Sequence, residues 1–190
     1  MIEKAKNDFP KLNWIHGKAE EVRTDIKYSL VFSNAALQWI PNHEKAIPRL
    51  WEIVEHNGAF AAQIPKFEKM DINTALKEIL EKEKWIKCKN VDTNIRVFYD
   101  LDYYYESLSK KSDDIELWET HYFHIMPSQQ SIIDFIESTA LRPYLNELNN
   151  EEKIEFKNEL LIALKKYYKI QTDGKVLFPF KRIFILAYKN

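Results

Sequence analysis

The chain has 190 residues, of which 45% are hydrophobic and 30% charged, and its formal net charge is −1. These proportions are typical of a globular protein with enough apolar side chains for the core of a single domain, here residues 1–190. Lysine and arginine are spread along the chain instead of forming a basic stripe, which argues against a nucleic-acid-binding surface.

The compartment can be predicted from cysteine usage and from the absence of apolar segments. Cys88 is the single cysteine, so no internal disulfide can form, and a reducing cytoplasm is the simplest interpretation. The opening segment MIEKAKNDFP is charged and lacks the apolar stretch of a secretion signal. No apolar run approaches the roughly 20 residues that a membrane-spanning helix needs. We therefore expect a soluble, cytoplasmic protein with neither a nucleic acid nor a membrane as partner.

Glycine is rare, and its distribution excludes two common nucleotide-binding motifs. Gly17, Gly58 and Gly174 are the only glycines, and no two of them are close in sequence. Phosphate-binding loops and dinucleotide fingerprints need clustered glycines, because the backbone approaches the ligand closely and adopts positive φ. Neither motif is present in this sequence.

The first third of the chain predicts a β-α-β unit. A short strand is expected at 12–16, and the continuous apolar run at 28–33 predicts a second strand buried on both faces, as in a parallel sheet. Apolar residues at helical spacing predict a helix over 42–56, with Gly58 as its C-cap. A third strand is expected at 59–64. The three strands should be parallel, with a right-handed crossover.

The remaining two thirds predict helices with two further strands. Helical periodicity is expected over 72–80, over 128–139 with Ser128 as the N-cap, and over 150–168. The segment 115–123 alternates polar and apolar residues as a strand does, and 182–188 is a buried strand. We expect these two strands to lie antiparallel in the same sheet.

Several polar side chains in this part are candidates for binding. If the alternation holds, Tyr122 and His124 share one face of a strand, while His121 lies on the other, so the two histidines cannot share a metal ion. A solvated sheet face would produce the same pattern. Arg142 lies in the segment ALRP (140–143) and Arg182 at the end of the segment FPFKR (178–182). An arginine beside such a proline-containing turn is suited to the bidentate binding of a carboxylate. Ordinary surface arginines are the alternative.

Three segments carry a resemblance to a known family. They are, in order, VFSNAALQW, ETHYFHIMPSQQSIIDFIESTALRPYL and FPFKRIFILAY. In this order the chain resembles the trans-aconitate methyltransferases, which are enzymes dependent on S-adenosylmethionine. The resemblance runs from about Met1 to Tyr188. It implies an α/β fold, a Rossmann-like class I methyltransferase sheet with helical elements that cap the substrate.

The resemblance also implies roles for particular residues. Methyl transfer to a carboxylate needs no general base, because the nucleophile is already ionised at pH 7, so no catalytic acid or base is expected. The substrate would be a small polycarboxylic acid and the cofactor S-adenosylmethionine. The cofactor-binding candidates are Ala19, Glu20, Asn34 and Ala35, and the substrate-binding candidates are Gln38, Trp39, Tyr122, His124, Arg142 and Arg182.

The resemblance starts inside the family pattern. Family members begin with a strand, a glycine-rich turn, a helix and a second strand that carries an acidic ribose-binding residue, and these have no counterpart here. We expect residues 1–65 to be the remainder of the cofactor-binding half and residues 66–190 to be the substrate-binding helices and C-terminal strands. The chain would then be an N-terminally truncated methyltransferase, or a non-catalytic remnant or interaction module.

Two consequences of such a truncation can be stated in advance. Without the glycine-rich turn and the acidic residue, the chain is expected to bind S-adenosylmethionine poorly and to turn over no acid at a useful rate. Loss of two strands would also leave an unpaired sheet edge, through which a homodimer can form.

Overall fold

A computed structural model describes residues 2–67, 70–89, 91 and 97–190. These residues form two compact units. Unit 1 comprises residues 1–62, 99–117 and 185–190, and unit 2 comprises residues 63–98 and 118–184. The two units are described separately below, although three strands contribute residues to both of them.

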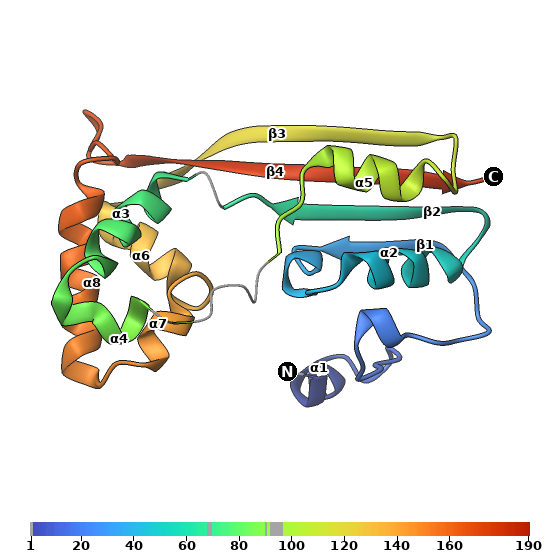
Figure 1. Cartoon of the computed structure of the whole chain (residues 1–190), viewed down its shortest axis with the longest axis horizontal. Coiled ribbons are helices and arrows are strands. Elements are labelled where there is room, and N and C mark those ends of the chain that lie inside the picture. Colours follow the sequence, from blue (N-terminus) through green and yellow to red (C-terminus); the bar gives the residue numbers. More distant parts are fainter. Residues whose placement is uncertain (1, 68–69, 90, 92–96) are drawn as a thin grey trace. The chain divides into compact units, whose positions relative to one another are not determined.

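The sheet has four strands in the order β1-β2-β4-β3 (Figure 1). Their bounds are Tyr28–Asn34 for β1, Val54–Pro65 for β2, Ile115–Met126 for β3 and Val176–Lys189 for β4. The ribbon shows β1 and β2 running in the same direction and β4 running against its neighbours. The mixed α/β fold with parallel and antiparallel strands is thereby confirmed, and the predicted strands at 28–33, 59–64, 115–123 and 182–188 lie within the observed ones.

The strand predicted at 12–16 was wrong. Helix α1 (Ile2–Asp8) and the short helix η1 (Ala19–Glu21) are separated by irregular backbone. A strand is stable only where a neighbouring strand accepts and donates its backbone hydrogen bonds, and this apolar stretch is short. Leu12 and Ile15 in this stretch are exposed, Ile15 by 73%, so the segment is not buried as a core strand would be.

The crossover between β1 and β2 is formed by α2 (His43–Glu52), whose N-cap Asn42 accepts a hydrogen bond from the backbone of Lys45. The helix ends before the predicted residue 56, and Gly58 is not its C-cap but lies inside β2. A Cβ atom on Gly58 would meet two backbone oxygens, those of Glu55 and Ser29, at 3.0 Å. The glycine is therefore needed because strands approach closely there, not because a helix ends.

Strand β1 is much less buried than its apolar sequence predicted. The expectation of burial on both faces was wrong, because Tyr28, Leu30 and Phe32 are exposed and the strand is at one edge of the sheet. Phe32 alone is 64% exposed. Alternate residues of a strand point to the same face, so these three side chains form one apolar stripe on β1.

Unit 1 also contains the short helix η2 (Leu37–Trp39) and α5 (Leu101–Leu108), and the remaining helices belong to unit 2. The core of unit 2 is formed by helices and by the first part of β4. Within this core, Trp85 packs edge-to-face on Phe156. Ser128 caps α6 as predicted, and a capping box of Asn149 and Glu152 begins α8. The helices of unit 2 are α3 (Asp71–Leu80), η3 (Glu83–Trp85), α4 (Ile86–Lys89), α6 (Gln129–Glu137), α7 (Arg142–Asn146) and α8 (Asn150–Leu164).

None of the helices formed by the described residues is both long and apolar enough to cross a membrane. The short helix η2 (Leu37–Trp39) follows β1 directly and is part of the site discussed next.

Candidate functional site

Three strands bring polar side chains together in unit 2. Arg182 on β4 donates a hydrogen bond from Nη1 to Oε1 of Gln63 on β2 at 2.7 Å. It also donates from Nε to Oη of Tyr122 on β3 at 2.5 Å. The guanidinium carbon lies 4.8 Å from the ring centroid of Phe180, two residues before it on the same strand. We refer to Gln63, Tyr122, His124 and Arg182 as the arginine cluster.

The local sequence explains why Arg182 can occupy this position. In β4 the buried residues are Val176, Phe178 and Phe180 in the first part, and Ile183, Ile185 and Ala187 in the second. Arg182 stands at this change, on the side of Phe180, where it is only partly buried. Its charge stays close to solvent while its flat guanidinium group packs on an aromatic ring.

His124 completes the cluster and is held in its neutral form. Its ring centroid is 5.1 Å from that of Tyr122 and 5.3 Å from that of Phe180. Burial lowers the pKa of His124, and the nearby positive charge of Arg182 lowers it further. Its Nε2 atom is buried and has no hydrogen-bond partner among the described residues.

Gln63 was not predicted from the sequence, although it belongs to the cluster. Its side chain is 5% exposed, and its Nε2 atom is buried without a partner among the described residues. The available signal was a polar residue inside the apolar run AFAAQIP, near the end of a buried strand. A buried amide that lacks one of its hydrogen bonds loses free energy unless a ligand or water completes it.

The cluster has an excess of donors and positive charge. No carboxylate among the described residues forms an ion pair with Arg182. Arginine can only donate hydrogen bonds, and Tyr122 accepts one from it, which leaves the Tyr122 hydroxyl proton to be donated elsewhere. Groups of this kind bind anions that carry several acceptor oxygens.

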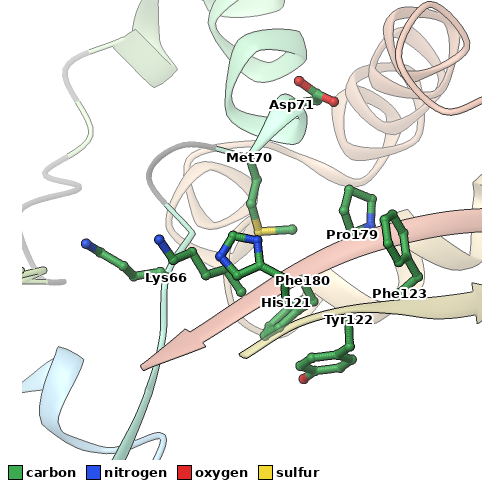
Figure 2. Close-up of a pocket in the computed structure, with 9 residues that line it drawn as sticks. Lys66, Met70, Asp71, His121, Tyr122, Phe123, Pro179 and Phe180 are labelled. Carbon is green, nitrogen blue, oxygen red and sulfur yellow. The ribbon is translucent and has the colours of Figure 1, made fainter. Parts of the chain in front are cut away.

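A cavity of about 290 Å³ adjoins the cluster in unit 2 (Figure 2). The close-up shows His121 beside Met70 and Tyr122 on the other side of β3. Lys181 forms an ion pair with Glu119, whose pKa is lowered chiefly by this hydrogen bond, so part of the positive charge at the cavity is already neutralised. The residues that line the cavity are Lys66, Met70, Asp71, His121, Tyr122, Phe123, Pro179, Phe180 and Lys181.

In unit 1 the loop after β1 has an unusual backbone. Ala35 has φ of 50°, in the left-handed region that an alanine seldom adopts. Gln38 donates from Nε2 to the carbonyl oxygen of Ala35 at 2.9 Å and thereby holds the turn closed. A carbonyl only accepts, so the amide oxygen Oε1 of Gln38 must face the other way. This atom is buried and has no partner among the described residues.

The buried His43 is hydrogen-bonded to the backbone of this loop. His43 Nε2 lies 2.8 Å from the carbonyl oxygen of Leu37, so this nitrogen must carry the proton. Its Nδ1 then accepts from the hydroxyl of Tyr104 on α5 at 3.0 Å. Burial lowers the pKa of His43, which keeps this arrangement neutral. Sequence reasoning missed His43, and the spacing of six residues from Leu37 gave no recognisable motif.

The other predicted site residues are distributed over both units. Ala19 and Glu20 form most of η1 and are half-buried, whereas Asn34 ends β1 and is exposed. Trp39 is 40% exposed. Arg142 is the exposed first residue of α7, and its side chain has no hydrogen-bond or ion-pair partner among the described residues. The cluster unites Tyr122, His124 and Arg182, and the expectation that Gln38, Trp39 and Arg142 share their cleft stays a prediction.

Within the described part of the chain, no group of three or more histidine, cysteine or acidic side chains is arranged to hold a metal ion.

Comparison with known proteins gives the family. A protein of Yersinia pestis (strain Pestoides F) named trans-aconitate 2-methyltransferase is 30% identical over 189 residues, which cover 99% of this chain and 73% of that protein. Proteins of the same name from Enterobacter sp. (strain 638) and Escherichia coli O7:K1 are 29% identical, again over 73% of their length. The chain belongs to the trans-aconitate 2-methyltransferase family. No family model matches it.

Solved structures support the fold of this methyltransferase-family chain at much lower identity. A Bacillus halodurans protein superimposes with a TM-score of 0.57 at 15% identity, covering 99% of this chain and 78% of its own. The YcgJ protein of Bacillus subtilis gives a TM-score of 0.55 at 14% identity, with coverages of 100% and 78%. At these identities the likeness concerns the fold alone.

Proposed function

We propose that the chain takes part, in the cytoplasm, in the transfer of a methyl group from S-adenosylmethionine to a carboxylate of a small polycarboxylic acid such as trans-aconitate. The observation that carries this proposal is the arginine cluster. It places an arginine with no described acidic partner, a phenol and an unsatisfied amide donor together in a member of this family. A polycarboxylate needs such a group of donors to be held beside a cationic cofactor.

The reaction needs alignment more than proton transfer. S-adenosylmethionine, when bound, supplies an electrophilic methyl group on a sulfonium. A carboxylate oxygen forms a bond to that carbon while the carbon–sulfur bond breaks, which leaves a methyl ester and a neutral thioether. The carboxylate is already ionised at pH 7. The contribution of Arg182 and Tyr122 is therefore to hold the acid in line, and the neutral His124 neither repels nor protonates it.

The loop after β1 has properties that suit the cofactor. The left-handed turn at Ala35 leaves the buried Oε1 of Gln38 as an acceptor without a described partner. An acceptor suits an N–H or O–H group, or a positive charge, and repels a carboxylate. We assign Gln38 to the cofactor side for this reason, together with Asn34 and Ala35, and keep Ala19 and Glu20 as the candidates near its adenine. On the substrate side we retain Trp39, Tyr122, His124, Arg142 and Arg182.

The experiment is a methyl-transfer assay with S-adenosylmethionine carrying an isotopic label in its methyl group. Slow labelling of a methyl ester of trans-aconitate, identified by mass spectrometry, is expected, with much less labelling of the monocarboxylate crotonate under the same conditions. Labelling of crotonate at an equal rate would contradict the polycarboxylate assignment. Arg142→Ala should raise KM for trans-aconitate far more than it raises KM for crotonate.

A second candidate function is a non-catalytic binding or interaction module. It is favoured by the exposed stripe of Tyr28, Leu30 and Phe32 on edge strand β1 and by the absence of clustered glycines. Calorimetric titration with S-adenosylhomocysteine separates the two. A micromolar dissociation constant supports the enzyme, whereas a value beyond millimolar, with trans-aconitate still bound, supports the module.

In either case we propose that a second copy of the chain pairs with β1. Identical edge strands related by a two-fold axis can hydrogen-bond to each other and bury their apolar stripes together. Sedimentation should then give a dimer for the natural chain and a monomer for Phe32→Lys. A monomer at all concentrations for the natural chain would refute this pairing.

A further inference from the structure

The amide of Gln63 can be oriented without ambiguity. The two ends of a glutamine amide are hard to distinguish by shape alone, but Arg182 has only donors, so the atom 2.7 Å from its Nη1 must be the amide oxygen. The NH₂ group therefore faces away from Arg182. It is this group that is buried without a partner among the described residues, on a side chain that is 5% exposed.

Two neighbouring groups share the requirement for an acceptor. The Tyr122 hydroxyl accepts the hydrogen bond from Arg182 Nε, so its own proton is available to another acceptor. Arg182 has no ion-pair partner in the part of the chain that the structure describes. Burial lowers the pKa of His124, and the positive charge of Arg182 lowers it further. A neutral acceptor such as a water fits less well than an anion, because water would leave the positive charge uncompensated.

We infer that Gln63 is a specificity-determining residue that recognises an ionised carboxylate through its NH₂ group, while Arg182 neutralises the charge. This inference rests on the proposed function and deepens it, because it names a residue that distinguishes the acid from its ester. A methyl ester has no charge and one fewer strong acceptor. The cluster should therefore hold an ionised carboxylate and release an esterified one.

The substitution Gln63→Glu tests this inference with the smallest change in shape. It keeps the oxygen that accepts from Arg182 and replaces only the NH₂ group by a second, negatively charged oxygen. The new carboxylate would neutralise Arg182 and repel an incoming anion. Gln63→Met removes both polar atoms at similar size, and Gln130→Met is the matched control, since Gln130 is an exposed glutamine on α6.

The measurement is an NMR titration of the 190-residue chain with trans-aconitate in the absence of cofactor, with thermal unfolding recorded for each variant. Saturable binding is expected for the natural chain and for Gln130→Met. It should weaken at least about tenfold in Gln63→Met and disappear in Gln63→Glu, since hydrogen bonds to charged groups are the strong ones. The trimethyl ester of trans-aconitate should not bind to any of them.

Unchanged binding in a folded Gln63→Glu chain would overturn the inference. So would the absence of binding to the natural chain, tighter binding of inorganic phosphate than of trans-aconitate, or equal binding of the ester. Because no cofactor is present, these outcomes are separate from a failure of methyl transfer. Intact carboxylate binding without any methyl transfer would contradict only the enzymatic proposal.

Discussion

The loop after β1 in unit 1 and the arginine cluster in unit 2 each contain a buried glutamine with one unsatisfied atom. In unit 1 the atom is Oε1 of Gln38, an acceptor, and the surrounding groups satisfy one another through His43 and Tyr104. In unit 2 the atom is Nε2 of Gln63, a donor beside a positive charge. The same residue type is thus prepared for ligands of opposite character, because its fixed partner is a carbonyl in one case and an arginine in the other.

The comparison also separates structural from binding roles. In unit 1 the polar contacts hold a strained turn in place, so their loss should affect stability first. In unit 2 the cluster is at the margin of the core and its charge has no described partner, so its loss should affect anion binding first. A substitution in this part of unit 1 that weakens anion binding without lowering stability would contradict the distinction. So would a substitution in the arginine cluster that lowers stability without weakening anion binding.

The largest effect is expected for Arg182→Met. This change removes the charge of Arg182, which would pair with a ligand carboxylate. A hydrogen bond to a charged group contributes about 1.5–3 kcal/mol, so trans-aconitate should bind roughly tenfold to 100-fold more weakly. Arg23→Met, which replaces an exposed arginine of unit 1, is the control. Titration calorimetry measures both, and equal affinities of the two variants would mean that Arg182 is not part of the binding site.

His43→Leu should lower the free energy of unfolding by about 2–3 kcal/mol. The Leu37 carbonyl and the Tyr104 hydroxyl would each lose a buried hydrogen bond, and buried polar groups without partners are destabilising. Chemical denaturation measures the change, with His56→Leu at an exposed position as the control. Carboxylate binding by the folded fraction should be unaffected. A loss of affinity with normal stability would contradict the structural role.

Acidification should destabilise the protein below about pH 6.5. Burial lowers the pKa of His43 in the folded state, so between that value and the unfolded pKa near 6.5 the unfolded chain binds more protons. The contribution of this group is therefore fully present above about pH 6.5 and is lost as the pH falls through the window. Thermal unfolding at pH 7.5 and 5.0 should show a smaller drop for His43→Gln than for the natural chain, whereas His56→Gln should behave like the natural chain.

The smallest effect is expected at the strained turn. Ala35→Gly should raise the free energy of unfolding by up to about 1 kcal/mol, because glycine adopts positive φ without a steric penalty. Ala36 has φ of −118°, so Ala36→Gly should lower stability by about 0.5–1 kcal/mol. A destabilising Ala35→Gly would mean that the left-handed turn is not formed in solution.

Periodic features of the chain were predictable from the sequence. The alternation in β3 placed Tyr122 and His124 on one face, and their ring centroids lie 5.1 Å apart. The crossover of β1, α2 and β2 followed from the change of period between strand and helix. These predictions succeeded because they depend on neighbours in sequence.

Features that depend on distant partners were not predictable. Gly58 had the position of a helix C-cap in sequence, yet it is required by the backbone of β1, which approaches from another part of the chain. The apolar run at 28–33 predicted burial that the edge position of β1 does not provide. The role proposed for Gln63 depends on its hydrogen bond with Arg182, which is 119 residues away in the sequence. No local pattern encodes that contact.

The central claim, that a carboxylate binds in the arginine cluster, is tested most directly by the pKa of His124 measured by NMR with and without saturating trans-aconitate. Its ring faces Tyr122 on β3, Arg182 and two phenylalanines on β4, and Phe135 on α6, so Arg182 is the charged group beside it. An anion bound to Arg182 should raise the pKa of His124, because negative charge stabilises the protonated ring, and should leave that of His43 unchanged. A ligand that binds without moving the pKa of His124, or that moves the pKa of His43 instead, would contradict the claim.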